Sequence, residues 1–285
     1  MKRYFSFFFL LFFLTLALLL TACGKEAVSE VSPAPTPKAY DSTTYMVHNE
    51  ETDMDIYCVE TRPTALAEGE KAPVIVYVHG GEGAATNFQN IYRVLAEGKV
   101  AGFSFECCGG NSTNAKSDGS ELYASHYTHR ISDLEAIVQH VKTLDYVDTE
   151  RIYLWGESYG GIVISLYAAH HPEIAGLILV STGLQEGMMG QPQDGGRSGY
   201  MAQYDFDDAF DAIKAYPGPV ICFNGQEDET GAHDAGLRQI EIYNERDSGT
   251  AEFVSLENSG HSYAAFSQAA KEITLARLRQ FIGVI

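Results

Sequence analysis

The sequence predicts an α/β protein built on a doubly wound, mostly parallel sheet in a single domain. Short, unbroken apolar runs bounded by Gly, Pro or Asp recur along the chain, as in strands that are buried on both faces of a parallel sheet. Segments with apolar residues three and four positions apart alternate with these runs, which indicates crossover helices. The 285 residues are 45% hydrophobic, enough for one large core, and this excludes a disordered chain.

The elements are predicted in chain order from these patterns. Residues 44–60 alternate in polarity around a polar turn and predict an antiparallel hairpin. The apolar runs predict buried strands at 74–78, 100–105, 152–155, 177–180, 220–223 and 253–256. The helical spacing predicts helices over 131–144, 162–171 and 266–281.

One interval is longer than a single crossover helix requires. Residues 183–218 contain seven glycines together with methionines and aromatic residues between two predicted strands. They predict a small cap over the carboxyl edge of the sheet, where α/β folds bind ligands. The alternative is an ordinary crossover with a long loop.

The N-terminus predicts export. Lys2 and Arg3 precede an apolar stretch over 4–20, and residues 1–22 therefore predict a cleaved signal peptide. The alternative is an uncleaved anchor helix. The ending Leu-Thr-Ala-Cys resembles the lipobox of bacterial lipoproteins, which implies a lipid on Cys23 and an extracytoplasmic, membrane-anchored protein. The proline-containing residues 23–42 predict an extended tether, and residues 43–285 the folded domain.

The chain is strongly acidic, with 38 acidic and 19 basic residues and a formal net charge of −19. Without residues 1–22 the basic count is 17, so the net charge is about −21. Such a surface repels phosphate backbones, which argues against a nucleic-acid partner.

A serine nucleophile is predicted at Ser158. It lies in Gly-Glu-Ser-Tyr-Gly-Gly, between the strand 152–155 and the helix that begins at 162. Glycines on both sides of a serine allow a sharp strand-to-helix turn that lifts the hydroxyl above the sheet edge. By itself G-x-S-x-G is a weak signal, and a plain turn serine is the alternative, but the strand-to-helix context favours a nucleophile.

His261 is the predicted general base, because it lies in a loop between the last strand and the last helix. The other candidates fall within helices, at helix ends or in a polar segment: His126, His129, His140, His170 and His171. The orienting carboxylate should follow another strand end, and the strand 220–223 leads to Asp228. Its neighbours Glu227 and Glu229 are interpreted as a solvated acidic loop.

Two backbone N–H groups are predicted to bind the developing oxyanion. One is that of Tyr159, directly after the nucleophile at a helix start. The other lies in the loop His-Gly-Gly-Glu-Gly after the strand 74–78, where Gly81 is the first choice and Glu82 the next. We expect His79 to brace this loop, and a Gly-rich turn without a ligand is the alternative.

These motifs resemble the α/β-hydrolase superfamily over about residues 70–285. The order Ser158, Asp228, His261 is that superfamily's order, and 105–119 with 156–161 look like small-cap esterases and serine-aminopeptidase-type hydrolases. Many relatives read Asp-x-x-Gly-x-Gly-x-Ser where this chain has Glu106 to Ser112. The departure places Cys107 and Cys108 at the expected pocket rim, whereas Cys58 and Cys222 are predicted to be inert core thiols.

The resemblance implies hydrolysis of a small-molecule carboxylic ester, with a small acyl or aryl-acyl group, through an acyl-enzyme and without a metal or organic cofactor. An exopeptidase is the second hypothesis, with Glu82, Glu157 and Glu186 as candidates to bind a substrate ammonium. A catalytically silent, ligand-binding lipoprotein is the third. Acids near the pocket (Glu82, Glu157, Glu227 and Glu229) are expected to disfavour anionic substrates.

Overall fold

The computed structural model describes residues 38–81, 83–109, 116–119, 127–184 and 209–284. The predicted signal peptide, Cys23 and most of the tether lie outside these ranges. The first strand begins at Tyr40, within the predicted tether. No helix within the described ranges is long and apolar enough to cross a membrane.

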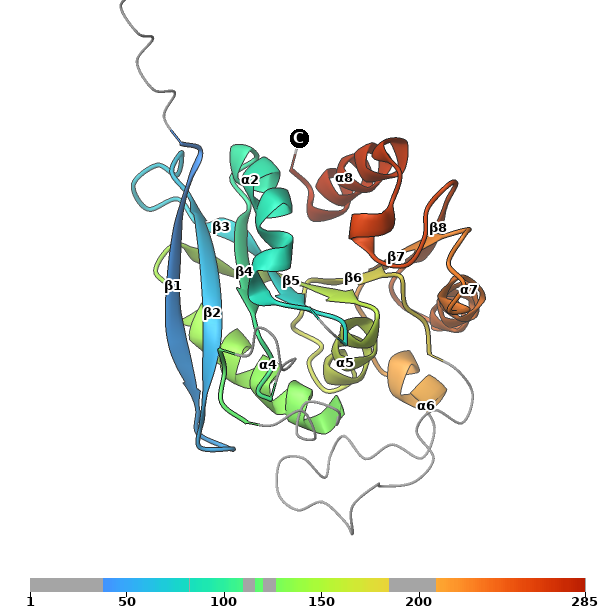
Figure 1. Ribbon diagram of the computed structural model, residues 1–285, viewed down its shortest axis with the longest axis horizontal. Helices are drawn as coiled ribbons and strands as arrows, with labels where there is room; N and C mark the ends of the chain where they lie inside the picture. Colours follow the sequence, from blue (N-terminus) through green and yellow to red (C-terminus); the bar gives the residue numbers. More distant parts are fainter. Residues whose placement is uncertain (1–37, 82, 110–115, 120–126, 185–208, 285) are drawn as a thin grey trace, which may run out of the picture. The chain divides into compact units, whose positions relative to one another are not determined.

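The described residues form an eight-stranded sheet in the order β1-β2-β4-β3-β5-β6-β7-β8 (Figure 1). Its strands are β1 Tyr40–Asn49, β2 Met54–Pro63, β3 Ala72–Val78, β4 Ala101–Phe105, β5 Val147–Glu157, β6 Gly176–Val180, β7 Val220–Gly225 and β8 Ala251–Leu256. β1 pairs antiparallel with β2, and β2 antiparallel with β4, whereas all later pairs are parallel. The predicted doubly wound sheet and its N-terminal antiparallel hairpin are therefore confirmed.

Helices cover both faces of the sheet (Figure 1). The α-helices are α2 Gln89–Glu97, α4 Tyr127–Lys142, α5 Tyr159–Ala168, α6 Ala209–Lys214, α7 Ala232–Tyr243 and α8 Gln268–Ile282, with short 3-10 helices η1 Ala85–Phe88 and η3 Tyr263–Ala265. Helices α2 and α8 pack on one face, and α4 to α7 on the other. The predicted helices correspond to α4, α5 and α8, while α2 and α7 have no predicted counterpart.

Alternation along the central strands divides the core between the two faces. Tyr77 and Trp155 belong to the cluster under α2 and α8. Val76 and Leu154, one residue earlier in each strand, belong to the cluster under α4 to α7. Because side chains two residues apart share a face, Glu157 at the end of β5 points toward the α2 and α8 side.

The predicted cap, 183–218, lies mostly outside the described residues. Its described end contains α6, and Ile213 and Tyr216 are fully buried in the core cluster with α5 and α7. This end of the interval packs onto the sheet layer. The Tyr216 hydroxyl also donates a hydrogen bond of 2.8 Å to the Ile174 carbonyl oxygen.

Candidate active site

Ser158 lies in a sharp turn between β5 and α5, with φ 54° and ψ −120°. A non-glycine residue with positive φ is strained and is held there by its surroundings. At Gly160 a Cβ atom would collide with the Val78 carbonyl oxygen, so a larger residue there would push α5 away from β3. The turn is therefore built to bring the Ser158 side chain to the carboxyl edge of the parallel sheet.

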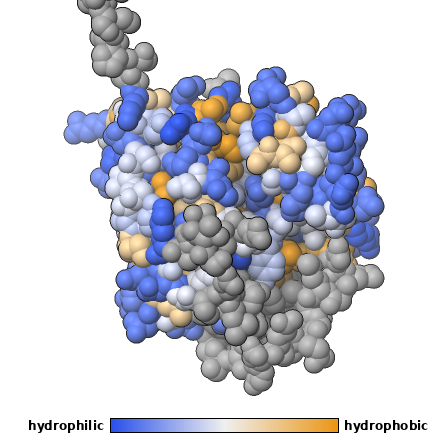
Figure 2. All heavy atoms as spheres, viewed as in Figure 1, coloured by the Kyte–Doolittle hydropathy of each residue, from blue (hydrophilic) through white to orange (hydrophobic). Residues whose placement is uncertain are grey.

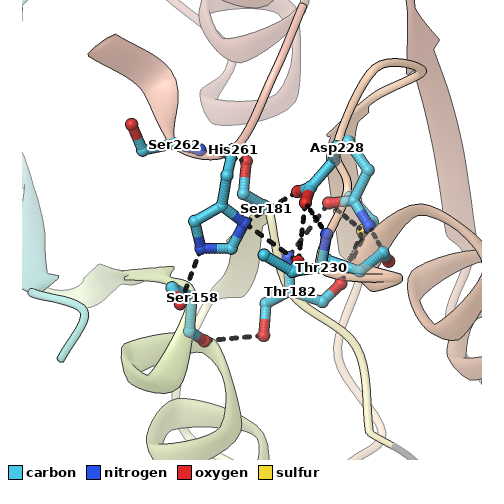
Figure 3. Close-up of polar contacts among 10 residues, drawn as sticks. Ser158, Ser181, Thr182, Asp228, Thr230, His261 and Ser262 are labelled. Carbon is cyan, nitrogen blue, oxygen red and sulfur yellow. Dashed lines mark hydrogen bonds and ion pairs between the residues drawn. The ribbon is translucent and has the colours of Figure 1, made fainter. Parts of the chain in front are cut away.

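Three side chains from three loops form a continuous chain of hydrogen bonds (Figure 3). The Ser158 Oγ lies 2.9 Å from His261 Nε2. On the other side of the ring, His261 Nδ1 lies 2.7 Å from Asp228 Oδ2. With the proton on Nδ1, Nε2 is free to accept the serine proton, which is the arrangement that acyl transfer requires. The structure thus brings together Ser158, His261 and Asp228.

Asp228 is fixed by a residue that the sequence reasoning missed. Thr230 donates to Asp228 Oδ1 through its backbone N–H at 2.9 Å and through its hydroxyl at 2.6 Å. Burial by itself raises the pKa of Asp228, but the hydrogen bonds from Thr230 and His261 outweigh burial and hold the pKa below its usual value. The signal was present, since an Asp followed two residues later by Thr is typical of a side-chain-capped turn.

The loops that carry Asp228 and His261 are joined directly. The Glu227 N–H donates to the Ser259 carbonyl oxygen at 2.9 Å. Directly after the histidine, the Ser262 N–H donates to Ser181 Oγ at 2.8 Å. Because β6, β7 and β8 are parallel neighbours, the loops that follow them meet at one edge of the sheet. The two hydrogen bonds between these loops fix the position of His261 relative to this edge.

A small cavity of about 240 Å³ opens in front of this chain of hydrogen bonds. Its described lining mixes hydroxyl and apolar groups: Ser158, Tyr159, Ile162, Ser181, Thr182, Gly183, Thr230, Ala232 and His261. Carboxylates are absent from this described lining. Its volume lies below the range of about 300–1,000 Å³ found for drug-sized ligands, so it suits a small group.

The two predicted oxyanion donors, Tyr159 and Gly81, are chain neighbours of Ser158 and of Gly80. Tyr159 is the first residue of α5, where backbone N–H groups are not used inside the helix. Gly80 packs against the serine so closely that a Cβ atom there would lie 3.1 Å from Ser158 Cβ. Gly81, the preferred donor, comes next and has open space around its Cβ position, whereas Glu82 lies outside the described residues.

His79 is fully buried and contacts the Gly-rich loop that follows β3, as expected for a brace. Its Nδ1 lies 2.6 Å from the Gly80 carbonyl oxygen, and its Nε2 accepts the Cys107 N–H at 3.0 Å. Burial and the nearby charge of Arg130 lower the pKa of His79 to about 4, so the ring is neutral at pH 7. The two contacts place its single proton on Nδ1.

The vicinal cysteines are buried in the core. Cys107 and Cys108 are fully buried free thiols and line neither cavity, so the prediction that they lie at the pocket rim is wrong for the described structure. The reason is that their backbone N–H groups are drawn inward, to His79 Nε2 and to Asp133 Oδ2. Cys58 and Cys222 are buried free thiols, and burial raises the pKa of both.

Glu157 faces a second cavity on the other side of the sheet. This cavity of about 620 Å³ lies between α2 and α8, and apolar side chains gather in that hollow in Figure 2. Burial raises the pKa of Glu157, although the Tyr263 N–H and His261 act in the opposite direction. Glu157 is therefore separate from the described lining of the Ser158 cavity, and Glu186 lies outside the described residues.

The remaining candidates have other contacts. His140 Nε2 lies 3.0 Å from the Tyr45 hydroxyl, and the His171 ring stacks on Tyr167. Glu227 and Glu229 are exposed beside Asp228, as predicted for a solvated acidic loop. Within the described ranges, no group of three or more His, Cys, Asp or Glu side chains is arranged to hold a metal ion.

Comparison with protein families and curated sequences finds partial similarity to two kinds of protein. A family model described as serine aminopeptidase, S33, matches residues 69–199. The proline iminopeptidase of Lactobacillus helveticus (strain DPC 4571) is 29% identical over 127 residues, which are 43% of this chain and 40% of that protein. The chain thus spans less than half the length of the curated relatives that it matches.

Comparison with solved structures finds a similar fold in two hydrolases. Est1E from Butyrivibrio proteoclasticus with bound ferulic acid has a TM-score of 0.64 and 21% identity, over 84% of this chain and 97% of that one. A putative dienelactone hydrolase from Klebsiella pneumoniae subsp. pneumoniae MGH 78578 has a TM-score of 0.66 and 16% identity, over 85% and 99%. At this level of identity the likeness is one of fold.

Proposed function

We propose that this chain, a hydrolase of the α/β-hydrolase fold, cleaves carboxylic esters of small acyl or aryl-acyl groups through an acyl-enzyme. The observation that carries the proposal is the hydrogen-bonded chain from Ser158 through His261 to Asp228. A serine hydroxyl is a poor nucleophile at neutral pH, and this arrangement supplies the base that activates it.

In the proposed reaction, Ser158 Oγ attacks the ester carbonyl carbon while His261 Nε2 takes the serine proton. Asp228 stabilises the resulting imidazolium, and the N–H groups of Gly81 and Tyr159 bind the oxyanion. When the intermediate collapses, the C–O bond to the alcohol breaks and His261 protonates the leaving oxygen. A water molecule, deprotonated by His261, then attacks the acyl-enzyme, releases the acid and returns the proton to Ser158.

The lining of the Ser158 cavity supports an uncharged acyl group. Ile162, Gly183 and Ala232 offer apolar or open surface, and the polar members of the described lining are mainly hydroxyls. An aminopeptidase needs a carboxylate to bind the substrate ammonium, but Glu157 points into the second cavity instead. The exopeptidase alternative is favoured by the family match and by the proline iminopeptidase relative.

A matched pair of substrates separates the two activities. Methyl propanoate and alanine methyl ester differ only in the α-ammonium group, and the full-length chain is assayed on both by pH-stat titration. We expect kcat/KM for methyl propanoate to equal or exceed that for alanine methyl ester. A preference of tenfold or more for the alanine ester would replace the ester proposal with the exopeptidase one.

A fluorophosphonate probe tests the third alternative, the silent binding protein. We expect the probe to label the wild-type chain and not the Ser158→Ala variant, whose circular dichroism should match the wild type. Absence of labelling of the folded wild type would indicate that Ser158 is not an activated nucleophile.

We also propose that the domain is held at a membrane by a lipid on Cys23, with residues 1–22 removed. The basic start, the apolar stretch and the small residue before Cys23 support this. Expression in a bacterial host with labelled palmitate should give a labelled, membrane-associated protein. The Cys23→Ser variant should lose the label, and a labelled variant would contradict the proposal.

A further inference from the structure

Arg130 is a buried cation that none of the proposed chemical steps uses. It lies on α4 and is only 3% exposed. Its Nη1 donates to the backbone carbonyl oxygens of Gly80, at 3.1 Å, and of His79, at 3.3 Å. Its guanidinium carbon lies 4.7 Å from the centre of the Tyr159 ring. Arg130 therefore contacts both segments that carry the proposed oxyanion donors.

The contact with Gly80 bears on the N–H of the next residue. The Gly80 carbonyl and the Gly81 N–H belong to one planar trans peptide unit, so they point in opposite directions. The Gly80 oxygen accepts hydrogen bonds from Arg130 Nη1 and from His79 Nδ1. Fixing this oxygen on the α4 side consequently fixes the direction of the Gly81 N–H, although Gly81 itself is exposed and has little packed around it.

His79 without Arg130 would hold the Gly80 carbonyl oxygen less strongly than the two side chains do together. The ring is neutral, because burial and the charge of Arg130 lower its pKa to about 4. Hydrogen bonds from charged donors are roughly twice as strong as those between neutral groups. The guanidinium also polarises the Gly80 peptide unit, which makes the Gly81 N–H a better donor to a negative oxygen.

The contact with Tyr159 concerns the other donor. A guanidinium over an aromatic face is attracted by the ring's negative π-face, and more strongly where both groups are shielded from water. Tyr159 is the first residue of α5, so restraining its ring restrains the helix start directly after Ser158. One side chain thus restrains both N–H groups from outside the reaction space.

We propose that Arg130 is the positioning residue of the oxyanion site, aligning Gly81 through the Gly80 carbonyl and Tyr159 through its ring. The inference rests on the proposed acyl transfer at Ser158. It predicts that Arg130 stabilises the transition state more than the bound substrate, since the oxyanion is present only in the former. The effect should appear in kcat with little change in KM.

The test compares Arg130→Met, Arg130→Lys and a matched control in the full-length chain. Arg62→Met is the control, because Arg62 also lies over a tyrosine ring, Tyr146 at 4.5 Å, but on the hairpin strand β2. Each protein is assayed for kcat and KM on an ester, for affinity toward a trifluoromethyl ketone that forms an oxyanion on Ser158, and for unfolding in urea. The enzyme concentration used for kcat is that of the active sites of folded protein, titrated with the fluorophosphonate probe.

We expect Arg130→Met to lose about 10–100-fold in kcat, somewhat less than loss of a whole oxyanion donor, with a parallel loss of affinity for the ketone. Arg130→Lys keeps the charge but not the planar fork, so it should lose about 3–10-fold, and Arg62→Met should match the wild type. If Arg130→Met does not fold, Arg130→Lys carries the test. The proposal would be overturned if folded Arg130→Lys had the kcat and ketone affinity of the wild type. It would also be overturned if Arg62→Met lost as much kcat as the Arg130 variants. If the folded wild type neither reacted with the fluorophosphonate probe nor hydrolysed the ester, the proposed function itself would be refuted.

Discussion

Thr230 holds Asp228 by the carboxylate oxygen that His261 does not contact. The Thr230 hydroxyl and N–H both donate to Asp228 Oδ1, while His261 Nδ1 contacts Oδ2. The Asp228 side chain is fully buried, and His261 is about one-third exposed. With each oxygen engaged, the carboxylate cannot rotate without losing hydrogen bonds, so it presents a fixed acceptor to the imidazole.

The Thr230→Val variant should show this restraint in catalysis. It removes the hydroxyl donor but keeps the backbone one, and the loss of one hydrogen bond to a charged group, about 1.5 kcal/mol, predicts a roughly tenfold lower kcat. Thr230→Ser should retain most of the activity. Steady-state kinetics of both variants check this, and equal activity of Val and Ser would show that the hydroxyl has no role.

The same variant should change stability in a pH-dependent way. The pKa of Asp228 is depressed in the folded protein, so its ionised form contributes stability at neutral pH that is lost as pH falls through the folded pKa. Removing the Thr230 hydroxyl weakens this contribution, so urea unfolding should separate wild type and Thr230→Val more at pH 7 than at pH 3. If the difference in unfolding free energy between the two proteins stayed constant from pH 7 to pH 3, the Thr230 hydroxyl would not stabilise the ionised form of Asp228.

His79 and Asp133 should give opposite pH slopes to stability. Burial raises the pKa of Asp133 to about 6, so its contribution falls as pH rises from about 4 to 6. Burial lowers the pKa of His79 to about 4, so its contribution falls as pH drops from about 6.5 to 4. Each contribution to the free energy of unfolding is at most about 3 kcal/mol, and the two change in opposite directions with pH.

Asp133→Asn should reveal the His79 contribution alone. The amide can still accept the Cys108 N–H, so the fold is expected to survive. Relative to the wild type, its free energy of unfolding should drop more steeply between pH 6.5 and pH 4.5 in urea titrations. His79→Gln should show the reverse, and slopes parallel to the wild type in both variants would refute the opposing pair.

Two glycines near Ser158 should differ sharply in their tolerance of a methyl group. At Gly160 a Cβ atom would run into the Val78 and His79 carbonyl oxygens, whereas at Gly81 nothing lies within 4 Å. We expect Gly160→Ala to cost more than about 3 kcal/mol of unfolding free energy and Gly81→Ala less than about 1 kcal/mol. Thermal and urea unfolding of the two variants measure this, and equal stabilities would mean that α5 does not pack as described.

The acidic loop beside Asp228 should select against anionic substrates. Glu227 and Glu229 are exposed there, and their charges raise the energy of an approaching carboxylate. The double variant Glu227→Gln, Glu229→Gln should raise kcat/KM for a hemisuccinate ester about 2–5-fold at low salt and leave its neutral methyl ester unchanged. The gain should shrink at 0.5 M salt, and an equal gain for both esters would rule out an electrostatic cause.

Much of the sheet could be predicted because strands buried on both faces leave a simple signature. The runs at 74–78, 152–155 and 220–223 each fall within a strand, β3, β5 and β7. Helices α2 and α7 were not predicted. Helix α7 includes Gly236, which packs against Asn224 where a side chain would collide, so its place depends on its fit to the sheet. Helix α2 does carry a helical pattern, which was missed, because its buried residues recur at helical spacing: Ile91, Tyr92, Leu95 and Ala96.

The sequence alone determined that Ser158 occupies a glycine-flanked turn after a buried strand, and that Asp228 and His261 follow later strands in the required order. These are local properties, set by turn chemistry and by the end of each apolar run. Tertiary structure decided which groups from separate segments meet: Arg130 at the Gly80 carbonyl oxygen, and Glu157 in the second cavity. Those contacts depend on sheet register and on how separate loops and helices pack, and no pattern within one segment encodes that packing.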